Sequence, residues 1–298
     1  MHGTRTVTLD GPIDLRLTLG HLRRGTGDPT LRVNRGEAWR AHRTEAGPAA
    51  VRMRVRADGV ELEAWGTGAT VALEAAPELL GRHDRPGDFR PGGVLRDLAG
   101  RLRGLRIGRT GAVIEALVPA ILEQKVTGRE AWAAWRRIVL TWGEPAPGPL
   151  PVRVPPDPEV LAGTPYFELH RAGVERRRSE LIRFVCARAR RIEETTVLPR
   201  ADAHKRLLSI PGIGPWTVAE VAGRAWGDPD AVSLGDYHLP HLVSWVLAGE
   251  PRGDDDRMLE LLEPYRGQRG RVIRLLEAGA PRPPRRGPRM APRSIRTI

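Results

Sequence analysis

The hydrophobic period of the sequence changes once along the chain, and this change most limits the folds open to it. In residues 51–65, VRMRVRADGVELEAW, apolar and polar residues alternate around Asp58-Gly59, a pattern typical of a β-hairpin. Near Ala75 the period becomes helical, and beyond residue 94 nearly every segment has helical spacing. We therefore predict an α+β chain, with short strands from about residue 5 to residue 75 and helices after them.

The predicted boundary between the two parts is the loop 81–93, which is rich in proline, glycine and charge. We expect a β-rich domain over residues 1–90, a helical domain over 91–280 and a disordered basic tail over 281–298. The proline-dense stretch 143–158 is predicted to lack regular structure. Helices are expected at 94–105, 112–126, 129–142, 158–162, 166–171, 175–194, 201–208, 216–226, 237–247, 254–262 and 267–278.

The net charge of +12 and a pI near 11.1 favour a polyanionic partner, because neutralised phosphates release their condensed counterions. The tail from Pro281 to Ile298 carries six arginines and no acid, which is half of that charge. Alternatively, the arginines only keep the protein soluble, and no polyanionic partner is implied.

Several protein classes are disfavoured by composition. Cys186 is the one cysteine, which excludes an internal disulfide framework, a cysteine-held zinc site and a four-cysteine iron–sulfur cluster. No apolar run reaches the roughly 18 to 20 residues of a membrane span, and the N-terminus lacks the apolar core of a signal peptide. We therefore expect a cytoplasmic, nucleoid-associated protein that binds no membrane.

The segment Leu207–Thr217 has the form of a helix end, a glycine-rich turn and a new helix. Gly212 and Gly214 allow a sharp turn and a close approach to a ligand, and Ile213 between them would anchor the turn in the core. Pro215 suits the first turn of the second helix. Such a turn aims backbone N–H groups at one point, which favours an anion such as a DNA phosphate. An ordinary helix–loop–helix corner is the alternative.

Asp236 follows this hairpin in the segment LGDYHLP, twenty residues after Trp216. With these two features, the chain resembles the helix-hairpin-helix DNA glycosylases, and within them the bacterial inducible 3-methyladenine glycosylase branch. The segments AILEQKV (120–126), AGVERRRSELI (172–182) and LEPYRGQRG (262–270) extend the resemblance over most of the chain. An aspartate placed between a glycine and a helix is also a good N-cap, and this role is compatible with catalysis.

The resemblance implies a two-lobed helical domain beside the β-rich domain, and a reaction that hydrolyses the bond between a damaged base and its sugar. In that reaction the Asp236 carboxylate would stabilise the oxocarbenium-like sugar and activate water. Lyase members of the superfamily use a lysine in the second hairpin helix, where this chain has Trp216. Lys125 and Lys205 are the only lysines. We therefore expect a monofunctional glycosylase acting on alkylated purines.

The resemblance also assigns a pocket for the flipped-out base. Trp216 and Tyr265 match aromatic positions of that pocket, whereas Glu220 and His21 stand where the resembled branch has aromatic residues. Glu220 would favour a cationic base or accept a hydrogen bond from an amino group. Alternatively, Glu220 is an exposed helix residue that pairs with Arg224 at i+4 and has no role in the pocket. The expected pocket is therefore more polar and more acidic than in the resembled enzymes.

The expected partner is double-stranded DNA with damaged bases, bound by a monomer. Gly212, Ile213, Gly214 and Thr217 would hold a phosphate, and the resemblance implies that a monovalent cation, the only cofactor considered, bridges the hairpin to it. Gln124 and Lys125 lie where the family inserts a side chain into the DNA, although a polar pair flanking the end of a helix is equally compatible with them.

Two other functions stay open from the sequence. A glycosylase for oxidised purines such as 8-oxoguanine would suit the polar pocket, although its usual lyase lysine is missing. A non-catalytic DNA-binding module would need the glycines but not Asp236. No metal site is expected, since His238 and His241 lack a third ligand.

Overall fold

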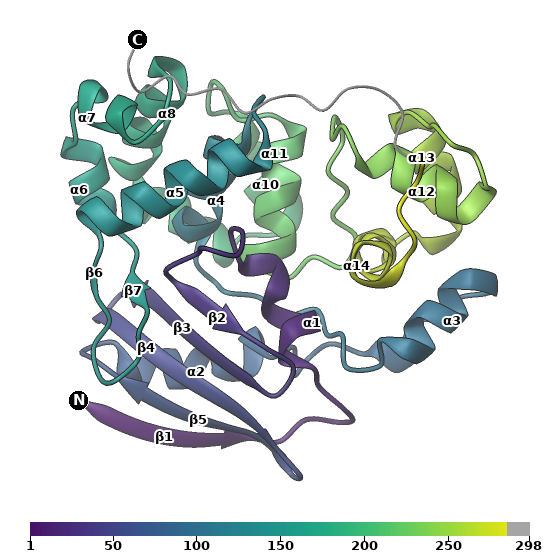
Figure 1. Cartoon of the computed structure of the whole chain (residues 1–298), viewed down its shortest axis with the longest axis horizontal. Helices are drawn as coiled ribbons and strands as arrows, with labels where there is room; N and C mark the ends of the chain where they lie inside the picture. The colour runs from purple at the N-terminus through teal and green to yellow at the C-terminus, as the bar shows by residue number, and fades with distance from the viewer. Residues whose placement is uncertain (285–298) are drawn as a thin grey trace.

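The N-terminal part of the chain is built on a five-stranded antiparallel sheet (Figure 1). The computed structural model describes residues 1–284. The strand order is β1-β5-β4-β3-β2, and the strands are β1 (His2–Val7), β2 (Leu31–Val33), β3 (Glu37–Thr44), β4 (Gly47–Arg56) and β5 (Gly59–Trp65). The predicted hairpin turn at Asp58-Gly59 is confirmed. Gly59 has φ +150°, and a Cβ there would lie 2.3 Å from the Val7 carbonyl oxygen, so the turn requires glycine.

One face of this sheet is covered by two helices, α1 (Leu15–Leu19) and α2 (Ala69–Leu79), around a shared apolar cluster. The prediction of strands up to residue 75 missed α1 and the start of α2. On the other face, Leu150, Val152 and Val154 pack against the sheet.

The prediction that residues 143–158 lack regular structure was wrong. The segment contains a short antiparallel pair, β6 (Glu144–Pro145) and β7 (Arg153–Val154). The pair forms because the apolar residues between its prolines are buried against the sheet, which brings the two short stretches side by side.

The first helical lobe is a bundle around one large apolar cluster. Its helices are α4 (Val113–Glu123), α5 (Gly128–Trp142), α6 (Pro158–Gly163), α7 (Tyr166–Arg171), α8 (Arg176–Cys186), α9 (Ala189–Glu193), α10 (Arg200–Leu208) and α11 (Pro215–Val221). The helix predicted over 175–194 is broken at Arg188, so that α9 turns back toward α4. The helix predicted over 216–226 changes to a π-helical turn, Ala222–Trp226, in which the carbonyl oxygens of Arg224 and Ala225 accept hydrogen bonds from Thr110 and Gly111.

The second lobe combines segments from both ends of the helical part. Helix α3 (Gly93–Arg101) packs with α12 (Leu239–Ala248), α13 (Asp255–Leu262) and α14 (Arg269–Gly279) around a separate apolar cluster. In Figure 1, α12–α14 lie beside the first lobe, the sheet lies below the first lobe, and α3 lies below α12–α14. The two-lobed helical part expected from the resemblance is therefore present in the fold.

Residues 285–298, most of the predicted basic tail, lie outside the described residues. None of the described helices is long and apolar enough to cross a membrane.

Candidate DNA-binding and catalytic site

The predicted hairpin connects α10 to α11. Gly212 has φ +96°, and an added Cβ would lie 3.0 Å from the Leu181 side chain, so both conformation and space favour glycine. Ile213 is buried in the first lobe, which anchors the turn as expected. At Gly214 the fold leaves open space where a Cβ would stand. Internal packing therefore does not require glycine at Gly214, whereas close approach of a ligand to the backbone would.

Gln124, at the end of α4, contacts the hairpin directly. Its side-chain amide Nε2 donates to the Gly212 carbonyl oxygen at 3.0 Å and to Thr217 Oγ1 at 2.9 Å. Thr217 is buried. Both side chains therefore position the hairpin in this structure.

Lys125 has φ +55°, and no other non-glycine residue among residues 1–284 has a positive φ. A left-handed lysine is a strained conformation that the surrounding chain must impose. The side chain is exposed at the tip between α4 and α5. At that tip it is free to contact a large ligand.

Asp236 is held by three donors from two elements. Its Oδ1 accepts the backbone N–H groups of His238 at 2.7 Å and Leu239 at 2.9 Å, so it caps the N-terminus of α12. Its Oδ2 accepts the indole N–H of Trp216 at 3.3 Å. The carboxylate remains partly exposed. It is thus oriented by α11 and α12 while solvent can still reach it.

The loop that carries Asp236 is fixed by a residue that the sequence did not single out. Gly235, with φ +84°, donates its N–H to Asp255 Oδ2 at 2.7 Å. Asp255 belongs to the first turn of α13. Asp255 therefore ties the N-terminus of α13 to the loop that carries Asp236.

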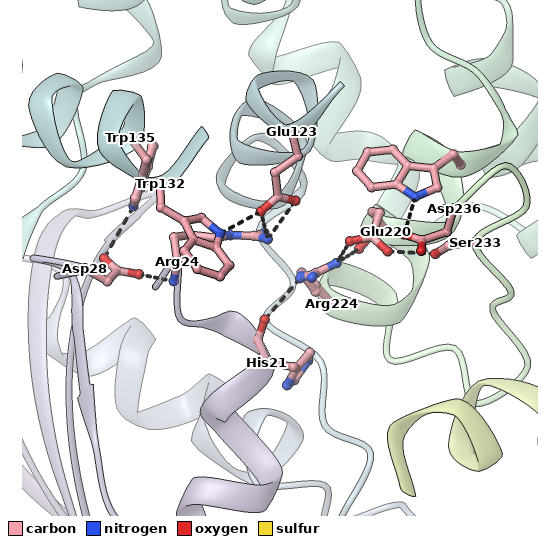
Figure 2. A network of polar contacts seen from close by, with 11 residues as sticks. His21, Arg24, Asp28, Glu123, Trp132, Trp135, Glu220, Arg224, Ser233 and Asp236 are labelled. Atoms are coloured by element: carbon pink, nitrogen blue, oxygen red, sulfur yellow. Dashed lines mark hydrogen bonds and ion pairs between the residues drawn. The ribbon is translucent and has the colours of Figure 1, made fainter. Parts of the chain in front are cut away.

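Glu220 lies beside this aspartate in a network of polar contacts (Figure 2). Its carboxylate forms an ion pair with Arg224, and its Oε1 accepts from Ser233 Oγ at 2.7 Å. Burial raises the pKa of Glu220, but the charge of Arg224 and the hydrogen bond from Ser233 outweigh it, so the pKa is lowered. The pairing with Arg224 is present, yet each side chain of the pair is only 17% exposed. Glu220 is therefore an ionised and already partnered residue near Asp236.

The same network reaches the N-terminal part of the chain. Arg224 Nε donates to the His21 carbonyl oxygen at 3.3 Å, and Arg24 forms an ion pair with Glu123 at 3.2 Å (Figure 2). Arg274 of α14 donates to the Leu17 carbonyl oxygen at 2.8 Å. Contacts from the sheet domain and both lobes thus meet around the predicted site.

The two ring nitrogens of His21 are buried within this junction, and neither has a hydrogen-bond partner among the described residues. Burial, followed by the charges of Arg274 and Arg224, lowers the pKa of His21 well below its ordinary value. Its imidazole is therefore neutral near pH 7.

Another carboxylate, that of Glu277 on α14, lies near Glu220 and Asp236. Burial, followed by the charge of Glu220, raises the pKa of Glu277, and Asp236 adds to the effect. Glu277 is nevertheless an exposed residue, so the neighbouring negative charges are the firmer cause of its raised pKa.

Tyr265 packs against the apolar cluster of the second lobe, with its ring 6.1 Å from that of Phe89. No hydrogen bond among residues 1–284 connects it to Asp236 or Trp216. The polar contacts join Trp216 to Asp236, and they join Glu220 to the His21 backbone through Arg224. The place of Tyr265 in the base pocket stays a prediction.

Sequence reasoning missed Arg24, Glu123, Ser233, Arg274 and Glu277 as neighbours of the site. Arg24 and Glu123 are 99 positions apart, and no local spacing predicts their pairing. The i, i+4 spacing of Glu220 and Arg224 was the one useful signal.

The chain is similar in sequence to two proteins named for DNA repair. No family model matches the chain. It is 32% identical over 152 residues to a Mycobacterium tuberculosis protein named "Probable bifunctional transcriptional activator/DNA repair enzyme AlkA", covering 49% of this chain and 29% of that protein. It is 27% identical over 161 residues to the Bacillus subtilis protein "Putative DNA-3-methyladenine glycosylase YfjP", covering 52% and 55%. The chain thus spans less than a third of the length of the first relative and about half the length of the second.

Solved structures show the fold over nearly the whole chain. The 3-methyladenine DNA glycosylase from Archaeoglobus fulgidus has a TM-score of 0.78 at 20% identity, covering 92% of this chain and 97% of that one. The 8-oxoguanine glycosylase/lyase from Clostridium acetobutylicum has a TM-score of 0.68 at 13% identity, covering 93% and 95%. The sheet domain and both helical lobes therefore form an arrangement already known among DNA glycosylases.

Proposed function

We propose that the chain is a monofunctional DNA glycosylase of the helix-hairpin-helix superfamily. It releases alkylated purines of the 3-methyladenine type from double-stranded DNA. The observation that carries the proposal is the position of Asp236. Its carboxylate is oriented by Trp216 and by the N-terminus of α12, and it remains partly exposed directly beside the hairpin helix.

DNA would be held by the hairpin and by the tip between α4 and α5. Gly214 leaves its backbone open to a phosphate, and Gln124 keeps the hairpin in place by binding Gly212 and Thr217. Backbone carbonyl oxygens of the turn suit a monovalent cation, which would supply positive charge to a phosphate oxygen. Lys125, exposed and held at positive φ, would enter the space left by the flipped-out base.

The reaction would depend on electrostatic stabilisation. As the bond to the base lengthens, the sugar gains positive charge, and the fixed Asp236 carboxylate is placed to stabilise it and to orient the attacking water. An alkylated purine is already cationic and leaves without a strong general acid. The hydrogen bonds to His238, Leu239 and Trp216 keep the carboxylate from rotating away.

A lyase step would require an amine near the sugar. The position of the lyase lysine is occupied by Trp216, and its indole binds Asp236. Lys205, on α10, and Lys125 are the two lysines of the chain. The proposed product is therefore an intact abasic site.

Base release from chemically methylated duplex DNA tests the substrate. We expect free 3-methyladenine or 7-methylguanine, and no covalent adduct when borohydride is added during the reaction. Release of oxidised bases alone would contradict the assigned substrate, and a trapped adduct would contradict the monofunctional reaction.

A second substrate class has one observation in its favour. Glu220 and Arg224 pair with each other near Asp236, and the His21 ring has no hydrogen-bond partner. Such polar groups suit a base recognised by hydrogen bonds, such as 8-oxoguanine. Duplex DNA with a single 8-oxoguanine is therefore the appropriate second substrate in the same assay.

A further inference from the structure

A groove of about 690 Å³ lies between the N-terminal sheet and α5, away from Asp236. We call it the basic groove. Its walls are the loop 23–30, parts of β2 and β3, and the exposed side of α5. Four of its lining residues are arginines: Arg23, Arg32, Arg136 and Arg153.

These arginines keep hydrogen-bonding capacity for a ligand. Arg32 is exposed and forms no ion pair among the described residues. The Nε of Arg23 is buried without a partner. Arg136 uses NH1 to bind the Gly27 carbonyl oxygen at 3.2 Å, and Arg153 uses Nε and NH2 to bind backbone carbonyl oxygens. None of the four forms an ion pair with a carboxylate of residues 1–284.

The two acids of the lining are already engaged. Asp28 accepts from the Arg24 backbone at 2.6 Å, from the Thr30 side chain at 2.8 Å and from Trp135 Nε1 at 3.3 Å. Glu37 forms an ion pair with Arg52 at 2.7 Å. Because the donors to Asp28 are uncharged, its carboxylate offsets one of the four arginines, and the groove still presents a net positive charge.

The groove is also preorganised. Gly25 has φ +75°, and a Cβ there would lie 2.7 Å from the Trp132 ring, so the loop rests directly on α5. The bonds of Arg136 to Gly27 and of Asp28 to Trp135 fix the same loop. A rigid site loses little conformational entropy when it binds a ligand.

Helix α5 joins this groove to the proposed DNA-binding tip. The helix begins three residues after Lys125, and Arg136 lies eight residues beyond its first residue. At 1.5 Å per residue this is about 12 Å along the helix. Backbone phosphates follow each other at about 3.4 Å of helix axis per strand, so about 12 Å corresponds to three or four nucleotides.

We propose that the basic groove binds the DNA backbone flanking the lesion, as a second contact surface outside the catalytic site. The inference rests on the proposed function, because DNA is the polyanion that the hairpin and Lys125 would already hold. Each phosphate neutralised there would add to affinity and to its dependence on salt.

Binding of an undamaged duplex tests the groove in the full chain. The substitution Arg32→Ala is compared with Arg82→Ala, a matched exposed arginine outside the groove. Affinity is measured by fluorescence anisotropy against an undamaged duplex of about 25 base pairs, more than two helical turns. The salt dependence is measured with the same duplex.

We expect Arg32→Ala to weaken binding of this duplex by about 3- to 10-fold, and to reduce the slope of log K against log salt by about 0.9. Binding by Arg82→Ala should stay near the wild-type value. The double substitution Arg32→Glu and Arg136→Gln should enlarge the loss. Equal effects of Arg32→Ala and Arg82→Ala would overturn the proposal.

This test is separate from the test of the proposed function. Binding of undamaged DNA can be measured whether or not any base is released. With saturating enzyme, Arg32→Ala should release base at the wild-type rate, since the groove lies outside the catalytic site.

Discussion

Asp255 is the residue outside the proposed site with the most direct effect on its geometry. It holds Gly235 by one hydrogen bond of 2.7 Å, and Gly235 precedes Asp236. We expect Asp255→Ala to lower the rate of base release by about 10-fold, because misplacement of a catalytic group by about 1 Å can cost 100-fold. Asp255→Asn keeps an oxygen acceptor and should recover most of the rate.

Single-turnover kinetics with saturating enzyme measure this effect without a contribution from DNA binding. Asp254→Ala is the matched control, since Asp254 caps α13 by accepting from Arg257 and does not contact Gly235. A rate for Asp255→Ala equal to that of Asp254→Ala would rule out positioning by Asp255.

His21 makes the stability of the fold sensitive to acid. Burial and the charge of Arg274 lower its pKa well below 6.5, so the folded chain keeps the ring neutral where the unfolded chain takes up a proton. The free energy of unfolding should therefore fall as the pH falls below 6.5, by at most about 1.4 kcal/mol per pH unit from this group. His42 is also buried with a lowered pKa and adds a separate loss.

Urea unfolding at pH 7.5 and 5.5 measures the difference. His21→Phe removes the titrating ring and should reduce the loss of stability between the two pH values. An unchanged loss in His21→Phe would show that the buried ring does not cause it.

Part of the site could be predicted at the level of residues. Trp216 and Asp236 were found because the hairpin and the following helix start have local signals, and the structure brings the two side chains together. The partners of Glu220 illustrate what was missed. Ser233 lies 13 residues away and contacts it only because the π-helical turn and the loop after it bend the chain back.

Among the elements, the N-terminus of α4 has an unusual cap. Ala112 precedes the helix and offers no side-chain acceptor, and Glu193 of α9 instead accepts from Val113 and Ile114 at 2.8 Å each. Burial nevertheless raises the pKa of Glu193, against the effect of these hydrogen bonds. A carboxylate from another helix thus binds two N–H groups that the helix cannot satisfy by itself.

We expect Glu193→Ala to lower the free energy of unfolding by about 1 to 2 kcal/mol, the usual effect of losing an N-cap. Glu194→Ala is the control, because Glu194 forms an exposed ion pair with Arg206 that should contribute about 0 to 1 kcal/mol. Chemical denaturation measures the free energy of unfolding of both variants. Equal losses of this free energy in the two variants would exclude a capping role for Glu193.

Most helices were predictable because their apolar spacing is a local property, as in α5 and α10. The break after α8 was not, since residues 187–188 contain neither glycine nor proline. After the break, Glu193 accepts hydrogen bonds from Val113 and Ile114 of α4, a contact about 80 positions away that no local pattern reveals. The β6–β7 pair was missed for a similar reason, because its stability comes from burial against the sheet.

At the scale of the whole molecule, the predicted boundary loop is tied firmly to the second lobe. Asp84 forms an ion pair with Arg271 of α14, with side chains only 6% and 3% exposed, and it accepts the Ile107 N–H at 2.9 Å. Composition predicted a domain boundary in this loop, and no local pattern in residues 81–93 reveals that Asp84 pairs with Arg271 of α14.

Asp84→Ala should lower the free energy of unfolding by about 3 to 5 kcal/mol, because it leaves Arg271 buried without its partner. We also expect the wild type to unfold in one transition when followed by both circular dichroism and tryptophan fluorescence. Asp88→Ala, in the same loop but exposed, serves as the control. A loss for Asp84→Ala no larger than for Asp88→Ala would contradict the role of this contact.

The central claim is that Asp236 carries out base release, and a single-turnover assay on methylated duplex DNA tests it most directly. Wild type and Asp236→Asn are compared at saturating enzyme, with DNA affinity measured in parallel. We expect Asp236→Asn to keep DNA binding and lose base release by at least about 100-fold, the scale of losing one electrostatic stabiliser of a transition state. Equal rates of base release by the two proteins would contradict the claim.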